Sequence, residues 1–284
     1  MFPNPYKVEN FGNSGGGGGT ITSQTLRSSN CAYVRLGQIV GIDNVVEQAR
    51  RMGITTPLED AVSMPLGTKE VHPIEMAAAV ASIAADGVYN APYYVDRIED
   101  PLGKVLLAHT PNPRRAASAQ TARLAADVLE KNVEGGTGTK ARIPGQPAAG
   151  KTGTAQDASD GWFVGFTPYM ATAVWIGWPE AKVPVEIRGT GITGGSYPAE
   201  IWGRYMRAWH EGLDERDFVD PDPITRSSRY LRVDRKYDSS GGSPTRRRPT
   251  TSTTGTTRPT PSTIPPDDVE PPTTIAVPTT ETVP

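Results

Sequence analysis

The chain has 284 residues with 29 lysines and arginines against 31 aspartates and glutamates, so its net charge is −2. This length is enough for one sizeable core, and the near-balanced charge gives no sign of the basic character that nucleic-acid-binding proteins usually have. Cys31 is the single cysteine, which excludes an internal disulfide. We predict no transmembrane segment because no apolar run reaches 18 residues, and no signal peptide because the N-terminus has no apolar h-region.

Composition divides the chain near Asp214. Residues 1–213 carry the apolar periodicity of a folded domain, whereas residues 214–284 are dominated by proline, threonine and serine. Such a segment buries too little apolar surface to offset a backbone entropy cost of about 1–2 kcal/mol per residue. We therefore predict a partial domain over residues 1–213 and a disordered tail over residues 214–284.

The apolar spacing within the domain changes from a helical period to a strand period after Gly145. Helices are predicted over residues 22–41, 42–53, 72–87, 118–133 and 197–213. Strands are predicted on both sides of an Asp-Pro-Leu-Gly turn within residues 93–108, and over residues 148–155, 161–168 and 169–179. The first helix begins at Thr22 or Ser23 as N-cap, and the last three strands form an antiparallel meander. Helices, a meander and a closing helix predict an α+β fold whose antiparallel sheet is covered by helices.

Two polar clusters carry candidate chemistry. In the strand "KTGT", Lys151 and Gly153 point to one face, and Thr152 and Thr154 point to the other. Glycine in a strand permits close approach of a ligand, and an edge strand offers free backbone groups to an extended peptide. By itself this stretch could equally be a threonine-rich surface strand with a solvated lysine.

The second cluster is "SSN", in which Ser28 and Asn30 stand before an apolar helix. The serine hydroxyl can pass a proton, and the asparagine amide can both donate and accept toward a substrate amide. Taken alone, this cluster is an ordinary helix cap. Because a helical segment separates the two clusters, we expect helices to form one wall of a cleft and the sheet to form the other.

Together these motifs resemble the transpeptidase domain of class A penicillin-binding proteins, most closely those of actinobacteria and mycobacteria. That family carries S-x-x-K, an S-D-N-like S-x-N and K-T-G. The resemblance extends from Tyr6 to Trp209 through four blocks in family order, namely "VENFGN", "LGTKEVHPIEMAAAVASIAADGVYNAP", "VEGGTGTKARIPGQPAAGKTGTAQDASDGWFVGFTPYMATAVWIGW" and "GGSYPAEIWGRYM". It implies the penicillin-binding transpeptidase and serine β-lactamase-like fold, incomplete at its N-terminus.

The resemblance also implies roles. Ser28 would shuttle protons, Asn30 would hold the substrate's amide carbonyl, and Lys151 would supply positive potential. Thr152 and Thr154, on either side of Gly153, would bind the C-terminal carboxylate of a D-Ala-D-Ala stem peptide or a β-lactam. The Thr154 N–H would be an oxyanion-hole donor. No metal and no cofactor is implied.

One family motif is missing from the sequence. No serine is followed three positions later by lysine, and "TGTK" at Thr137–Lys140 has the spacing but no serine. We therefore expect the chain to be N-terminally truncated, to begin after the nucleophile and to be inactive alone.

The sequence thus predicts part of a peptidoglycan D,D-transpeptidase, which when complete would act at the extracytoplasmic face of the membrane or in the cell wall. The alternative is a non-catalytic module that binds muropeptide or a partner, with cell-wall or divisome proteins as candidate partners of the tail.

Overall fold

The computed structural model describes residues 7–13, 17–59 and 61–224, all within one compact unit. Its α-helices are α1 (Ile21–Leu26), α2 (Asn30–Val40), α3 (Ile42–Arg51), α4 (Pro73–Ala84), α5 (Ala119–Gly135) and α6 (Tyr197–Trp209). Its strands are β1 (Val88–Tyr89), β2 (Arg97–Glu99), β3 (Val105–Ala108), β4 (Arg114–Arg115), β5 (Ala149–Thr154), β6 (Asp160–Phe166), β7 (Ala171–Gly177), β8 (Glu186–Ile187) and β9 (Thr190–Gly191). Within the described ranges, no helix combines the length and the apolar character needed to cross a membrane.

The largest sheet is the predicted meander. Strands β5, β6 and β7 are antiparallel neighbours in that order, so β5 lies at one edge of this sheet. Lys151 pairs with Val164, and Thr152 pairs with Phe163. The residues of β5 are mostly small, and the large aromatic side chains belong to β6. Because β5 is the edge strand, the K-T-G motif lies along the edge of the sheet.

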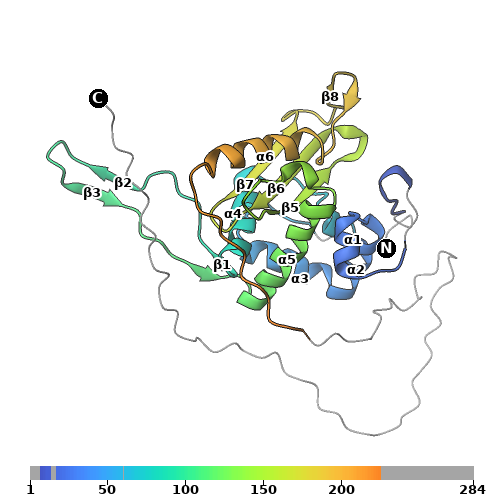
Figure 1. Cartoon of the computed structure of the whole chain (residues 1–284), viewed down its shortest axis with the longest axis horizontal. Helices are drawn as coiled ribbons and strands as arrows, with labels where there is room; N and C mark the ends of the chain where they lie inside the picture. Colours follow the sequence, from blue (N-terminus) through green and yellow to red (C-terminus); the bar gives the residue numbers. More distant parts are fainter. Residues whose placement is uncertain (1–6, 14–16, 60, 225–284) are drawn as a thin grey trace, which may run out of the picture. The chain divides into compact units, whose positions relative to one another are not determined.

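Helices cover both faces of this sheet (Figure 1). On one face, Trp202 and Met206 of α6 are fully buried, and the ring centroid of Trp202 lies 5.1 Å from that of Phe163. On the other face, α4 and α5 pack against β5, β6 and β7, with Ala149 and Phe166 in the core. The fold is therefore the predicted α+β architecture of an antiparallel sheet covered by helices.

The prediction of one continuous helix over residues 22–41 is wrong. α1 ends at Leu26, and the hydroxyl of Ser29 accepts a hydrogen bond from the Ala32 N–H to start α2. Serine competes in this way for backbone donors and so ends one helix and begins another. Between the two helices, Ser28 has a left-handed backbone with φ of 52°, and this turn sets the direction of its side chain.

Three local predictions are confirmed. The hydroxyl of Ser118 caps α5, Pro73 is the first residue of α4, and β2 and β3 form the expected hairpin around Asp100. Figure 1 shows this hairpin extending away from the sheet.

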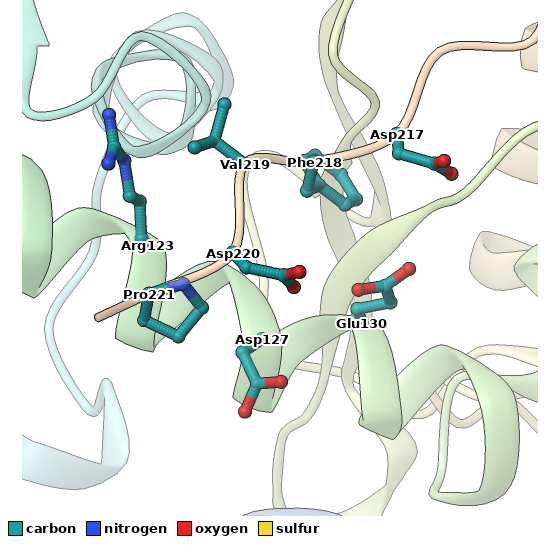
Figure 2. A pocket seen from close by; sticks show the side chains of 8 residues that line it. All are labelled: Arg123, Asp127, Glu130, Asp217, Phe218, Val219, Asp220 and Pro221. Atoms are coloured by element: carbon teal, nitrogen blue, oxygen red, sulfur yellow. The ribbon is translucent and has the colours of Figure 1, made fainter. Parts of the chain in front are cut away.

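The stretch after α6 belongs to the predicted tail, yet residues 214–224 lie on the domain. The ring of Phe218 meets Phe166 edge to face at 5.5 Å, and Gln120 exchanges two hydrogen bonds with the backbone of Asp222. Figure 2 shows Phe218 on this stretch, where carboxylates of the stretch and of α5 line the same pocket. Residues 225–284 lie outside the described residues, so the disorder and the partners predicted for them stay predictions, whereas the contacts of residues 214–224 do not fit a disordered tail that begins at Asp214.

Candidate active site

The backbone of β5 presents alternate residues to the open edge of the sheet. The Ala155 N–H donates to the Asp160 carbonyl, so odd-numbered residues of β5 bond to β6 and even-numbered residues face away from it. In agreement, the carbonyl of Gly150 accepts a bond from a side chain of α5, and the carbonyl of Thr152 accepts one from Lys151. The N–H of Thr154 therefore faces the open edge, where an extended ligand can reach it.

The two predicted motifs meet at the Lys151 side chain. Its Nζ donates to Ser28 Oγ at 2.8 Å, to the Thr152 carbonyl at 2.9 Å and to Thr152 Oγ1 at 3.3 Å. The left-handed turn at Ser28 between α1 and α2 aims the serine at the sheet edge. Residues 123 positions apart thus share one hydrogen bond, and all three ammonium protons have acceptors.

Burial lowers the pKa of Lys151 from 10.5 to about 8. No acidic side chain is among the acceptors of its hydrogen bonds in the described residues, so no negative charge opposes the effect of burial. At pH 7 the amine is still mostly protonated, because the pH is about one unit below this pKa. The site therefore combines a positive charge with two neutral hydroxyls, which suits an anionic ligand.

Thr152 and Thr154 are each held by a neighbouring segment. Thr152 Oγ1 lies 2.7 Å from Thr137 Oγ1, and Thr154 Oγ1 accepts a bond from the Gly194 N–H at 3.0 Å. A Cβ added to Gly194 would come within 2.3 Å of the Gly153 carbonyl oxygen, so only glycine permits this close approach to the strand. The loop before α6 is thereby packed directly on the K-T-G motif.

Asn30 lies at the start of α2 but has a different partner. Its amide nitrogen donates to the Glu9 carbonyl at 2.8 Å, and no hydrogen bond of the described residues joins it to Ser28 or Lys151. The structure therefore brings Ser28, Lys151 and Thr152 together by hydrogen bonds, whereas the Asn30 amide is engaged by the stretch that precedes α1.

Two further residues belong to the site, although the sequence motifs do not identify them. Thr137 contacts Thr152, and Asn132 of α5 forms hydrogen bonds both to the K-T-G strand and to Thr137. A polar residue on the buried face of the helix over residues 118–133 was the signal that could have identified Asn132. Across the part of the chain that the structure describes, no group of three or more His, Cys, Asp or Glu side chains is placed to hold a metal ion.

A K-T-G lysine on a sheet edge that contacts the serine of an S-x-N motif, within an α+β domain, is the arrangement expected of the penicillin-binding class of proteins. The family described as "Penicillin binding protein transpeptidase domain" matches residues 3–182, which is more than half of the chain. The chain therefore belongs to the penicillin-binding protein transpeptidase family.

Penicillin-binding protein 1A of Clostridium acetobutylicum is 33% identical over 264 residues, which cover 89% of this chain and 32% of the relative. The chain thus spans about a third of the length of that curated relative. Penicillin-binding protein PonA1 of Mycobacterium tuberculosis has a similar structure, with a TM-score of 0.72 and 25% identity over 77% of this chain and 64% of that one. The imipenem acyl-enzyme complex of penicillin-binding protein A from the same organism gives a TM-score of 0.58 and 25% identity, over 73% of this chain and 53% of that one.

Proposed function

We propose that this chain is the C-terminal part of a peptidoglycan D,D-transpeptidase and that its sheet edge binds the C-terminal carboxylate of D-Ala-D-Ala stem peptides and of β-lactams. The observation that carries the proposal is the 2.8 Å hydrogen bond from Lys151 to Ser28. This contact unites the K-T-G strand with the S-x-N corner, although 123 positions of sequence separate the two residues.

The hydrogen bonds of the two threonines support carboxylate binding. Thr154 Oγ1 accepts from the Gly194 N–H, so its own proton is available for a ligand. Thr152 Oγ1 accepts from Lys151 at 3.3 Å. A carboxylate at the edge of β5 would therefore meet hydroxyl donors in the field of the Lys151 ammonium, and charge-assisted bonds of this kind are about twice as strong as neutral ones.

The remaining roles follow from the same contacts. Lys151 would stabilise negative charge that develops on Ser28 Oγ when that serine passes a proton, and the Thr154 N–H would be one donor to the oxyanion. Asn30 would bind the amide carbonyl of the substrate. That role requires its amide nitrogen to leave the Glu9 carbonyl, to which it donates in this structure.

The chain does not supply the nucleophilic serine that would attack the substrate. None of its serines has a lysine three positions later. Removal of the nucleophile from a serine hydrolase costs about a millionfold in turnover. We therefore propose that this chain binds stem peptides and β-lactams reversibly and forms no acyl-enzyme by itself.

Two broader assignments belong to the same proposal. The whole protein would act on the extracytoplasmic side of the membrane, because its proposed substrate is the cell wall. The structural similarity to PonA1 of Mycobacterium tuberculosis supports an actinobacterial type.

Two measurements on the full 284-residue chain test the proposal. The first is the binding of an N-acyl-D-Ala-D-Ala peptide by titration calorimetry, for the wild type and for Thr152→Val with Thr154→Val. The matched control is Thr190→Val, which alters an exposed threonine of β9. We expect the double variant to weaken binding at least tenfold and the control to leave it unchanged. Equal binding by all three proteins would contradict the carboxylate site.

The second measurement is labelling with a fluorescent penicillin, followed by boiling and electrophoresis. We expect no label to survive, and a label mapped to a serine of this chain would disprove the claim that the nucleophile is absent. If a muropeptide without a free C-terminal carboxylate binds as well as the D-Ala-D-Ala peptide, the non-catalytic binding module replaces our proposal.

A further inference from the structure

The side chain of Asn132 is a fully buried amide beneath the candidate site. Its Nδ2 donates to the Gly150 carbonyl at 2.8 Å, and its Oδ1 accepts from the Thr137 N–H at 3.2 Å and from Thr137 Oγ1 at 3.3 Å. A carbonyl needs a donor and an N–H needs an acceptor, so these partners determine which way the amide faces. Asn132 thereby ties α5 both to the K-T-G strand and to the turn that follows α5.

Glycines around this amide make the arrangement tight. A Cβ on Gly136 would come within 2.3 Å of Asn132 Oδ1, and one on Gly195 would come within 2.7 Å of the Thr137 carbonyl oxygen. Thr137 is therefore held from two sides, by Asn132 and by the loop before α6. Its hydroxyl lies 2.7 Å from that of Thr152, so the position of one hydroxyl determines the position of the other.

The hydrogen bonds between Asn132, Thr137 and Thr152 can be arranged in two ways, which differ in the group to which each threonine hydroxyl donates its proton. Thr137 and Thr152 each have one hydroxyl proton. If Thr137 donates to Asn132, Thr152 must donate to Thr137 and turns its proton away from the open edge. If Thr137 donates to Thr152, the Thr152 proton is free for a ligand, and Asn132 Oδ1 still accepts from the Thr137 N–H. Only two hydroxyl rotations separate the arrangements.

We propose that Asn132 and Thr137 are positioning residues that set the direction of the Thr152 hydroxyl, so that it donates to a ligand carboxylate when one binds. The inference rests on the proposed carboxylate site and deepens it. On binding, Thr137 turns its proton from Asn132 to Thr152 Oγ1, and Thr152 turns its proton to the ligand. Asn132 keeps the Thr137 backbone in place throughout, because its bond to that N–H does not change.

The test compares two probes on the full chain, N-acyl-D-Ala-D-Ala and its C-terminal carboxamide. We expect the wild type to bind the acid more tightly than the amide. Thr137→Val keeps the shape of the side chain and removes the hydroxyl, so it should reduce this preference about five- to tenfold, the equivalent of one hydrogen bond made in the bound state. Water in the open site replaces Thr137 as a partner before binding but is excluded after it, so the loss falls on the complex.

Controls separate this role from a structural one. Thr137→Ser restores the hydroxyl and should restore the preference, whereas Thr139→Val, two residues away and exposed, should not change it. Thr137→Ala is the second variant if the valine destabilises the turn, and thermal unfolding is measured for each protein. Equal weakening of both probes, or an unchanged preference in both hydroxyl-free variants, overturns the inference. A wild type that does not distinguish acid from amide overturns the proposed function instead.

Discussion

Replacement of Lys151 by methionine should stabilise the fold at neutral pH while it removes ligand binding. The ammonium group lies in a site that lowers the pKa of Lys151 to about 8, and burial is the cause. A group held in its charged form against such a shift destabilises the folded state. Methionine has a similar length and carries no charge, so the variant avoids this cost.

The magnitude follows from the shift. A pKa that falls from 10.5 to about 8 corresponds to about 3 kcal/mol in favour of the neutral amine in the folded protein. Against this, the variant loses the three bonds from Nζ, at about 1 kcal/mol each for those to Ser28 Oγ and to the Thr152 carbonyl and at less for the 3.3 Å bond to Thr152 Oγ1. The net gain in the free energy of unfolding is about 1 kcal/mol, which raises the Tm by about 2–4 °C for a domain of this size.

The difference in stability between Lys151→Met and the wild type depends on pH. Below about pH 8 both folded and unfolded chains carry the charged lysine, so the wild type bears the full cost. Between pH 8 and 10.5 the unfolded chain binds the extra proton, so wild-type stability rises with pH and the advantage of the variant disappears.

Denaturant unfolding at pH 7 and pH 10 measures this difference, with the exposed Lys104→Met as the control. A Lys151→Met protein that is less stable at pH 7, by an amount that does not vary with pH, would refute the reasoning. Calorimetry on the same protein should show that peptide binding is weakened at least tenfold.

Two further predictions concern carboxylates. Burial opposes the ionisation of Glu75, but hydrogen bonds from Thr55, Thr56 and the His72 N–H outweigh it and lower its pKa to about 2. Its stabilisation, about 3 kcal/mol, is complete above pH 4.5 and is lost as the pH falls toward 2, so Glu75→Gln should flatten the acid-unfolding curve while the exposed Glu211→Gln does not. Burial, followed by the charges of Glu134, Asp127 and Asp217, raises the pKa of Glu130. The cost of this carboxylate is absent below the ordinary pKa of 4.5, grows as the pH rises above that value and is complete above the folded-state pKa, so Glu130→Gln should raise the Tm at pH 7 and not at pH 4. An equal change at both pH values would exclude this origin, and Glu47→Gln on the exposed face of α3 is the control.

The sequence predicts which residues form the site, but it does not predict all of the contacts between them. Lys151, Thr152 and Ser28 were selected because their motifs resemble a known family. The pairing of Asn30 with Glu9, and the support of Thr152 by Thr137, depend on partners that no spacing rule connects. The buried face of α6 also depends on tertiary packing. Trp202 is fully buried, while its neighbour Ile201 is 46% exposed.

By itself the sequence determined the local features: the period-two strands of the meander, the serine cap of α5, the hairpin turn at Asp100 and the glycine of the K-T-G strand. These depend on backbone preferences and on bonds between residues a few positions apart. Only the tertiary structure decided that Ser28 meets Lys151, that Asn132 lies beneath the strand and that burial lowers the lysine pKa. Those properties depend on atoms brought together from distant parts of the chain, whose positions are set by the packing of the sheet between its helices.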